Sequence, residues 1–214
     1  MLPSKNSKIT DLTHSLSNRM EGVGIVPAKT MAKDGWNATN LSLYSHVGTH
    51  MDAPIHFGVN HGTIDHIPLE RLITEAWVVN LAHVPPSALI TVADMEPIAH
   101  KIKKGQGVLL HTDWSKKLYT DDYRNKLPRI SRELAHWLGK KGVGLLGVEP
   151  PSVADVNNIG EVTEIHTILM KNDIIIIEGL KNLEQLTKEK VTLIALPLKV
   201  EGGDGAPARV LALE

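Results

Sequence analysis

His46-Val-Gly-Thr-His50-Met-Asp52-Ala-Pro-Ile-His56 places three histidines and one aspartate within eleven residues. The intervals between these four residues are four, two and four, so all of them share the same parity. Because side chains alternate between faces along an extended chain, the four would point to the same side. Pro54 disfavours a regular central strand beyond Asp52, so the later part is predicted to be a loop.

This residue set is suited to transition-metal chemistry. Neutral imidazole nitrogens and a carboxylate form a compact site for Zn²⁺, Mn²⁺ or Fe²⁺. A metal-bound water can ionise near neutral pH and attack an acyl carbon, while a histidine left off the metal moves the proton. The alternative is a set of unrelated surface histidines, which the shared parity disfavours.

Composition excludes several other classes of protein. The chain has 214 residues, 42% of them hydrophobic and 22% charged, which is typical of a soluble globular protein. We expect residues 1–214 to form a single domain. A net charge of −1 with scattered basic residues gives no footprint for nucleic acid or a membrane surface. There is no signal-peptide core and no cysteine, so we expect a cytoplasmic protein without disulfides or thiolate metal sites.

Strands and helices are predicted to alternate along the chain, which indicates an α/β fold whose strand order stays open. Ser131 is a predicted helix cap, and so is Thr91, which has an acid three residues later. Residues 22–40 are interpreted as a loop or a hairpin. The predicted strands are 9–13, 41–46, 76–81, 108–112, 143–148, 173–178 and 193–196, and the predicted helices are 92–103, 131–141 and 161–171.

A further pair of ligands is suggested near the carboxyl end of the chain. His166 lies in a predicted helix, and Glu178 ends the buried run Ile174–Ile177. An acid at the carboxyl end of a buried strand is a common position for a site in α/β proteins. Taken alone this signal is weak, and an acid that faces water is the favoured interpretation.

The motif around His46 also carries a resemblance. The pattern His-x-Gly-Thr-His-x-Asp-x-Pro-x-His-Phe is complete from His46 to Phe57, with eight fixed positions. In this the chain resembles the cyclase family of metal-dependent hydrolases, which includes bacterial kynurenine formamidase and isatin hydrolase. Weaker similarities extend over most of the chain and include Leu110–Trp114, Gly147–Val153 and Ala195–Arg209.

The resemblance implies a set of metal ligands and a fold. His46, His50 and Asp52 would hold a first ion. Asp52 would bridge to a second ion that His166 also holds, and Glu178 would reach both. One or two Zn²⁺ ions per chain are expected, with Mn²⁺ as the alternative. The implied fold is a compact α/β domain with a mixed, barrel-like sheet flanked by helices, assembled as a homodimer or homotetramer.

The resemblance further implies hydrolysis of a linear or cyclic amide, a C–N bond other than a peptide bond, by metal-activated water. His56 would be the catalytic proton donor and acceptor. The alternatives are ring opening of a small lactone or isatin-like substrate, and a catalytically silent metal-binding protein. Kynurenine formamidases carry an aromatic residue in the N-terminal segment, whereas Leu16–Pro27 has none. Trp36 is the candidate substitute, and the substrate itself stays open.

The remaining histidines and glycine-rich segments give no competing function. His61 and His66 are expected to be solvated loop residues, and Trp114 and Trp137 to be core or interface residues. Gly202-Gly-Asp-Gly205 lacks the lysine of a phosphate-binding loop. With no Gly-x-Ser-x-Gly elbow and no cysteine, covalent catalysis is disfavoured.

Overall fold

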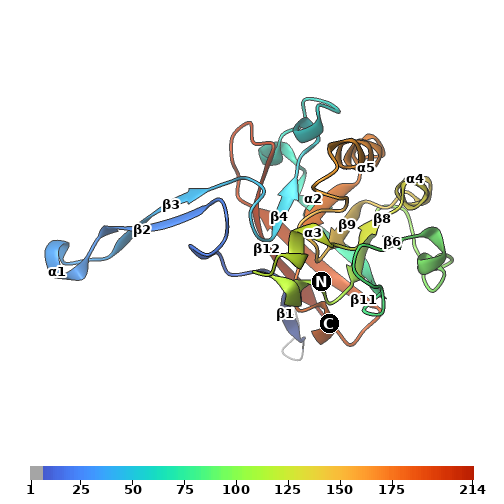
Figure 1. Cartoon of the computed structure of the whole chain (residues 1–214), viewed down its shortest axis with the longest axis horizontal. Helices are drawn as coiled ribbons and strands as arrows, with labels where there is room; N and C mark the ends of the chain where they lie inside the picture. Colours follow the sequence, from blue (N-terminus) through green and yellow to red (C-terminus); the bar gives the residue numbers. More distant parts are fainter. Residues whose placement is uncertain (1–6) are drawn as a thin grey trace.

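The computed structural model describes residues 7–214, and within them seven strands close into a mixed barrel (Figure 1). The order is β12-β11-β5-β7-β9-β10-β4, and β4 closes the ring by pairing with β12. β5, β7, β9 and β10 run parallel, whereas β4, β11 and β12 pair antiparallel with their neighbours. The barrel strands are β4 (His50–Asp52), β5 (Ile73–Asn80), β7 (Gly107–His111), β9 (Leu145–Val148), β10 (Ile175–Glu178), β11 (Lys190–Pro197) and β12 (Gly205–Leu213). The predicted α/β fold with a barrel-like mixed sheet is confirmed.

The two faces of the barrel wall have different neighbours. One set of alternating side chains, Met51 and Ile177 among them, comes from all seven strands and forms a buried apolar cluster inside the barrel. The opposite face packs against helices. Because neighbours along a strand face opposite sides, His50 and Asp52 flank Met51 on the outer face, and Glu178 follows Ile177 there. The strand pattern thus places all three polar side chains outside the barrel.

Two longer helices cover this outer face, α4 (Arg132–Lys141) and α5 (Ile159–Lys171). Ser131 caps α4, with its Oγ accepting a hydrogen bond from the Leu134 N–H at 3.1 Å, as the sequence predicted. Gly142 ends α4 in the left-handed conformation at φ 69°. α5 begins two residues earlier than predicted, and it carries the buried His166.

A β-hairpin arm projects from the body (Figure 1). It consists of β2 (Val23–Lys29), α1 (Met31–Asp34) and β3 (Ala38–Leu43). β2 and β3 form a sheet of their own that no other strand joins within the described residues. Of the two interpretations of residues 22–40, the hairpin is therefore the correct one.

The predicted helix over residues 92–103 is wrong. Only a short 3-10 helix, η3 (Val92–Met95), forms there, and turns follow it. The expected capping interaction is present, with the Thr91 N–H donating to Asp94 Oδ2 at 2.7 Å. Pro97 explains the early stop, because a proline in a helix interior has no N–H to donate and its ring clashes with the preceding turn.

The predicted strands each overlap an observed one, but β12 (Gly205–Leu213) was not predicted. Among the described residues, no helix is long and apolar enough to cross a membrane. The remaining elements are β1 (Ile9–Asp11), which pairs with β12, β6 (Leu89–Ile90), β8 (Arg129–Ile130), α2 (Leu69–Leu72), α3 (Asp122–Asn125), η1 (Pro54–Phe57), η2 (Ile64–His66), η4 (Trp114–Lys117) and η5 (Leu183–Gln185).

Candidate metal centre

A cluster of buried histidines and carboxylates lies on the outer face of the barrel, between β4, β10 and α5. β4 pairs antiparallel with β10 in a register that sets His50 directly opposite Glu178. α5 packs over these strands and contributes His166. Residues far apart in the sequence are thus brought together by strand pairing and helix packing.

Two of the histidines have one ring nitrogen fixed and the other aimed at carboxylates. His50 Nδ1 lies 3.1 Å from the Gly48 carbonyl oxygen, and His166 Nδ1 lies 2.7 Å from that of Val162. A carbonyl can only accept, so each Nδ1 carries the proton that it donates. Each Nε2 lies 3.3 Å from an oxygen of Glu178. This arrangement is typical of metal-binding histidines, whose second nitrogen is oriented by an outer hydrogen bond.

Asp52 is at the centre of the cluster, with a side chain that is 1% exposed. Its Oδ1 lies 2.9 Å from His46 Nδ1 and 3.5 Å from His50 Nε2, and its Oδ2 lies 3.6 Å from His166 Nε2. Asp52 Oδ2 and His50 Nε2 are buried and have no hydrogen-bond partner within residues 7–214. Buried polar atoms without a partner are rare, and imidazole nitrogen with carboxylate oxygen is the ligand set of Zn²⁺ and Mn²⁺. The residues therefore fit a divalent cation.

The electrostatics of the cluster also favour a cation. Burial by itself would lower the pKa of His46, but Asp52 and Asp204 outweigh it and raise that pKa to about 9. Burial is likewise outweighed at His50 and His166, where Glu178 raises both pKa values. Burial alone would raise the pKa of the Glu178 carboxyl, but its hydrogen bond with His166 and the neighbouring charge of His50 hold that pKa below its usual range. The carboxylates thus draw positive charge into a buried site.

Asp204 belongs to the site although it was not among the predicted residues. Its Oδ2 lies 3.1 Å from His46 Nε2 and 3.5 Å from His56 Nδ1. The signal in the sequence was the glycine-rich run around it. A Cβ at Gly205 would lie 2.6 Å from Cε1 of the His46 ring, so this position must lack a side chain for the ring to fit.

His56 lies beside the cluster on η1, with a quarter of its side chain exposed. Its ring stacks on that of His46 at 3.8 Å between centroids. Burial is the main cause that lowers the pKa of His56. His46, Asp52 and His56 each offer an atom within 4.8 Å of the others, so the geometry also admits His56 as a ligand. The six predicted site residues, His46, His50, Asp52, His56, His166 and Glu178, are thus all close together, and their individual roles stay predictions.

Other histidines and aromatic residues lie outside this centre. His61 and His66 are exposed, and Trp114 is buried, as expected. A second grouping joins His111, Asp113 and Glu184, but Lys116 already ion-pairs with Asp113 at 2.7 Å.

Trp36 does not substitute, within its own chain, for the N-terminal aromatic residue that Leu16–Pro27 lacks. It follows α1 at the far end of the arm, is 56% exposed, and lines neither cavity that touches the cluster (Figure 1).

Comparisons with known proteins show similarity to hydrolases over most of the chain. The Cyclase family model ("Putative cyclase") matches residues 10–155. The kynurenine formamidase of Erythrobacter litoralis is 30% identical over 83% of this chain and 77% of that protein. Isatin hydrolase A from Ralstonia solanacearum superimposes with a TM-score of 0.88 at 28% identity, over 97% of this chain and 92% of that one. A structure described as a potential metal-dependent hydrolase with cyclase activity gives a TM-score of 0.77 at 27% identity, over 97% and 98%.

Proposed function

The chain belongs to the cyclase family of metal-dependent hydrolases, and on this premise we propose that it hydrolyses a linear or cyclic amide of a small molecule. The observation that carries the proposal is the buried convergence of histidines and carboxylates around Asp52, where Asp52 Oδ2 and His50 Nε2 have no hydrogen-bond partner among the described residues. Kynurenine formamidases and isatin hydrolase A both act on bonds between a carbonyl carbon and nitrogen, which supports an amide as substrate.

We propose a specific division of the ligands. His46, His50 and Asp52 would hold one ion, His166 would join Asp52 around a second, and Glu178 would reach both. Zn²⁺ is the proposed ion, with one or two per chain, and Mn²⁺ is the alternative because the same nitrogen and oxygen ligands suit both. When bound, a divalent ion supplies Lewis acidity, which activates water as a nucleophile and stabilises the charge that develops on the acyl oxygen.

We propose that His56 moves the proton. Asp204 Oδ2 lies 3.5 Å from His56 Nδ1, and this negative charge favours the ring hydrogen on Nδ1, which leaves a lone pair on Nε2. Nε2 can then take a proton from the attacking water and return it to the leaving nitrogen. Partial burial lowers the pKa of His56, so the neutral ring that a general base requires is the major form at neutral pH.

Ring opening of an isatin-like substrate or a small lactone is the second candidate function. It is favoured by the close superposition on isatin hydrolase A over nearly the whole chain. A cyclic and a linear amide are attacked in the same way, so only turnover of matched substrates separates the two.

Metal analysis together with turnover tests the proposed function. We expect protein purified without chelator or nickel resin to contain one or two Zn²⁺ or Mn²⁺ per chain, measured by elemental analysis. It should hydrolyse formanilide, isatin or a small lactone. Chelation should abolish turnover, and re-addition of the same ion should restore it, because the attacking water would need the ion for its activation. Bound metal without turnover of any acyl compound would indicate a silent metal-binding protein, and no metal after reconstitution would refute the proposal.

Replacing Asp204 with asparagine is expected to lower kcat/KM by about 10–100-fold, the range typical of residues that orient metal ligands. The amide keeps the shape of the side chain but loses the charge that attracts His46 Nε2 and His56 Nδ1. Turnover and metal affinity should be measured together. Asp122→Asn, which removes the partner of Lys126 on the surface, is the matched control and should change neither. Wild-type turnover in the Asp204 variant would show that this carboxylate does not position the histidines.

We also propose that the protein is a homodimer or homotetramer in which the arm packs on a second copy. No residue of α1 is buried, and Met31, Trp36 and Leu41 are between 56% and 65% exposed. A two-stranded hairpin without packing is marginally stable in water, and exposed apolar side chains on a projecting element are typical of an interface.

Replacing Met31, Trp36 and Leu41 together with serine is therefore expected to yield monomers, measured by light scattering after size-exclusion chromatography. The matched control replaces Leu69, which is 66% exposed on α2 of the body, and should keep the wild-type assembly. An unchanged mass for the triple variant would contradict an interface on the arm.

A further inference from the structure

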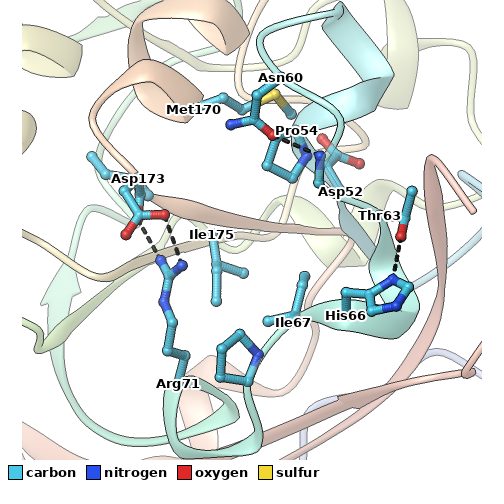
Figure 2. Close-up of a pocket in the computed structure, with 13 residues that line it drawn as sticks. Asp52, Pro54, Asn60, Thr63, His66, Ile67, Arg71, Met170, Asp173 and Ile175 are labelled. Atoms are coloured by element: carbon cyan, nitrogen blue, oxygen red, sulfur yellow. Dashed lines mark hydrogen bonds and ion pairs between the residues drawn. The ribbon is translucent and has the colours of Figure 1, made fainter. Parts of the chain in front are cut away.

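Two cavities touch the residues of the metal centre, and they differ in how their charged groups are paired. The first, of about 200 Å³, has Asp52 in its wall (Figure 2). Arg71 in this cavity directs its guanidinium at Asp173, with Nη1 2.7 Å from Oδ1, and His66 hydrogen-bonds with Thr63. The one arginine among the described residues of this wall is thus already paired with a carboxylate of the same wall.

The second cavity, of about 210 Å³, has His46 and His50 in its wall together with Arg19 and Arg124, and we refer to it as the arginine cavity. The chain contains six arginines. Within residues 7–214, four of them ion-pair with a carboxylate, and the two that do not are the two in this cavity. Glu21 is the one carboxylate among the described residues that line the cavity. Leaving the histidines aside, the wall therefore carries two positive guanidiniums and one negative carboxylate.

Arg19 is held in place by an aromatic ring. Its guanidinium carbon lies 4.2 Å from the centroid of the Tyr119 ring, and the Tyr119 hydroxyl hydrogen-bonds with Ser17 Oγ at 3.0 Å. Tyr119 adopts φ 70°, a conformation that a bulky residue rarely takes and that is found mainly where the surrounding structure imposes it. The fold therefore holds a strained residue in the wall of the cavity, under the arginine.

Arg124 lies on α3, directly after Tyr123, which also lines the cavity. Burial is the main cause that raises the pKa of Tyr123, and the positive charge of Arg124 lowers that pKa in part. Both guanidiniums thus stand in a cavity whose wall includes the histidines of the metal centre. A group bound by them would extend from the arginines towards the reacting bond.

We propose that the arginine cavity binds a carboxylate carried by the substrate, so that the preferred amide is an anionic small molecule. The inference rests on the proposed function, because it specifies the substrate of the same site. Guanidinium donors match the two oxygens of a carboxylate, and such charge-assisted pairs are stronger than neutral hydrogen bonds. A volume of about 210 Å³ suits a small ligand.

Kinetics with matched substrates test the proposal. The probes are 4-formamidobenzoate, its 2- and 3-isomers, and neutral formanilide, all assayed with the metal-loaded enzyme. At least one anionic isomer should have the higher kcat/KM. Arg19→Gln and Arg124→Gln should each reduce the preference for that isomer over formanilide by about tenfold or more, chiefly through KM, as expected for a hydrogen bond to a charged group. Arg132→Gln, on the surface beside Glu164, is the matched control and should leave both substrates unaffected.

Binding separates a failure of this inference from a failure of the proposed function. Benzoate and benzamide are titrated into the metal-loaded protein and followed by calorimetry. The inference is supported if benzoate binds more tightly than benzamide and either arginine variant weakens the binding of benzoate. This holds even if no amide is hydrolysed and the proposed function fails. Two results would overturn the inference even if amides are hydrolysed. Benzoate could bind no tighter than benzamide, or it could bind both variants as tightly as the wild type. In either case binding of the carboxylate does not depend on the arginines.

Discussion

Replacing Asp52 with alanine is expected to abolish metal binding and amide hydrolysis together. The Asp52 carboxylate lies within 2.9–3.6 Å of a ring nitrogen on each of three histidines, so its removal takes away the group that all of them face. Residues that merely orient metal ligands contribute about 10–100-fold to metal affinity or activity, and a residue that binds the metal directly should contribute more. We therefore expect the loss of kcat/KM to exceed about 100-fold, with the metal content falling close to zero.

Elemental analysis and turnover of the same preparation provide the measurement. Glu189→Gln is the matched control, because it removes one negative charge from an exposed ion pair with Lys101 far from the cluster and should keep the wild-type metal content. Circular dichroism should show that the Asp52 variant is folded. If that variant retains its metal and its activity, Asp52 is not a ligand and the proposed centre is wrong.

Much of the fold could be predicted because it depends on local patterns. Ser131 and Gly142 act within a few residues of α4, so the sequence alone located that helix. The error over residues 92–103 arose where a correct cap signal at Thr91 was followed by Pro97, which breaks the helix.

β12 was missed for a different physical reason. Its inward side chains are small, among them Ala206, Ala208 and Ala212, all buried inside the barrel. Alanine has a low strand propensity, and its place here depends on the narrow space that the other strands leave. A pattern that arises only after the barrel closes cannot be recognised along the chain.

The candidate site shows the same division between local and distant signals. The parity argument grouped residues that do lie close together, but only His50 and Asp52 share a strand, while His46 precedes it in a loop and His56 lies on a 3-10 helix. Their convergence therefore follows from tertiary packing more than from an extended chain. The motif could be recognised because its residues are neighbours in sequence.

Residues contributed by other parts of the chain were harder to find. Glu178 meets His50 through the register of β4 and β10, and that register is not readable from either strand alone. Asp204 lies 158 positions from His46, and its glycine-rich surroundings gave no sign of a histidine partner. Long-range pairing is decided by the closed barrel, which explains why these residues needed the structure.

Replacing His56 with alanine is expected to abolish activity while leaving the metal in place. A positioned general acid and base contributes about 10²–10⁴-fold, so kcat should fall by that factor. His56 is the most exposed of the clustered histidines, with a quarter of its side chain accessible, and its Nδ1 faces Asp204 and no oxygen of Asp52 or Glu178 at ion-pair distance. His66→Ala removes a histidine from an exposed position nearby and should change neither property.

The metal content of the His56 variant decides between two arrangements of the same cluster. His46, Asp52 and His56 could together hold an ion, because their donor atoms lie within 4.8 Å of one another. If the variant loses metal in proportion to activity, His56 is a ligand and the proton must be moved by another group. If metal is retained and kcat falls, the ion does not depend on His56, and the stacking of its ring on His46 serves to place a proton carrier beside the ion. The acid limb of the pH–rate profile should then disappear with His56, since protonation of that ring is what limits the wild type at low pH.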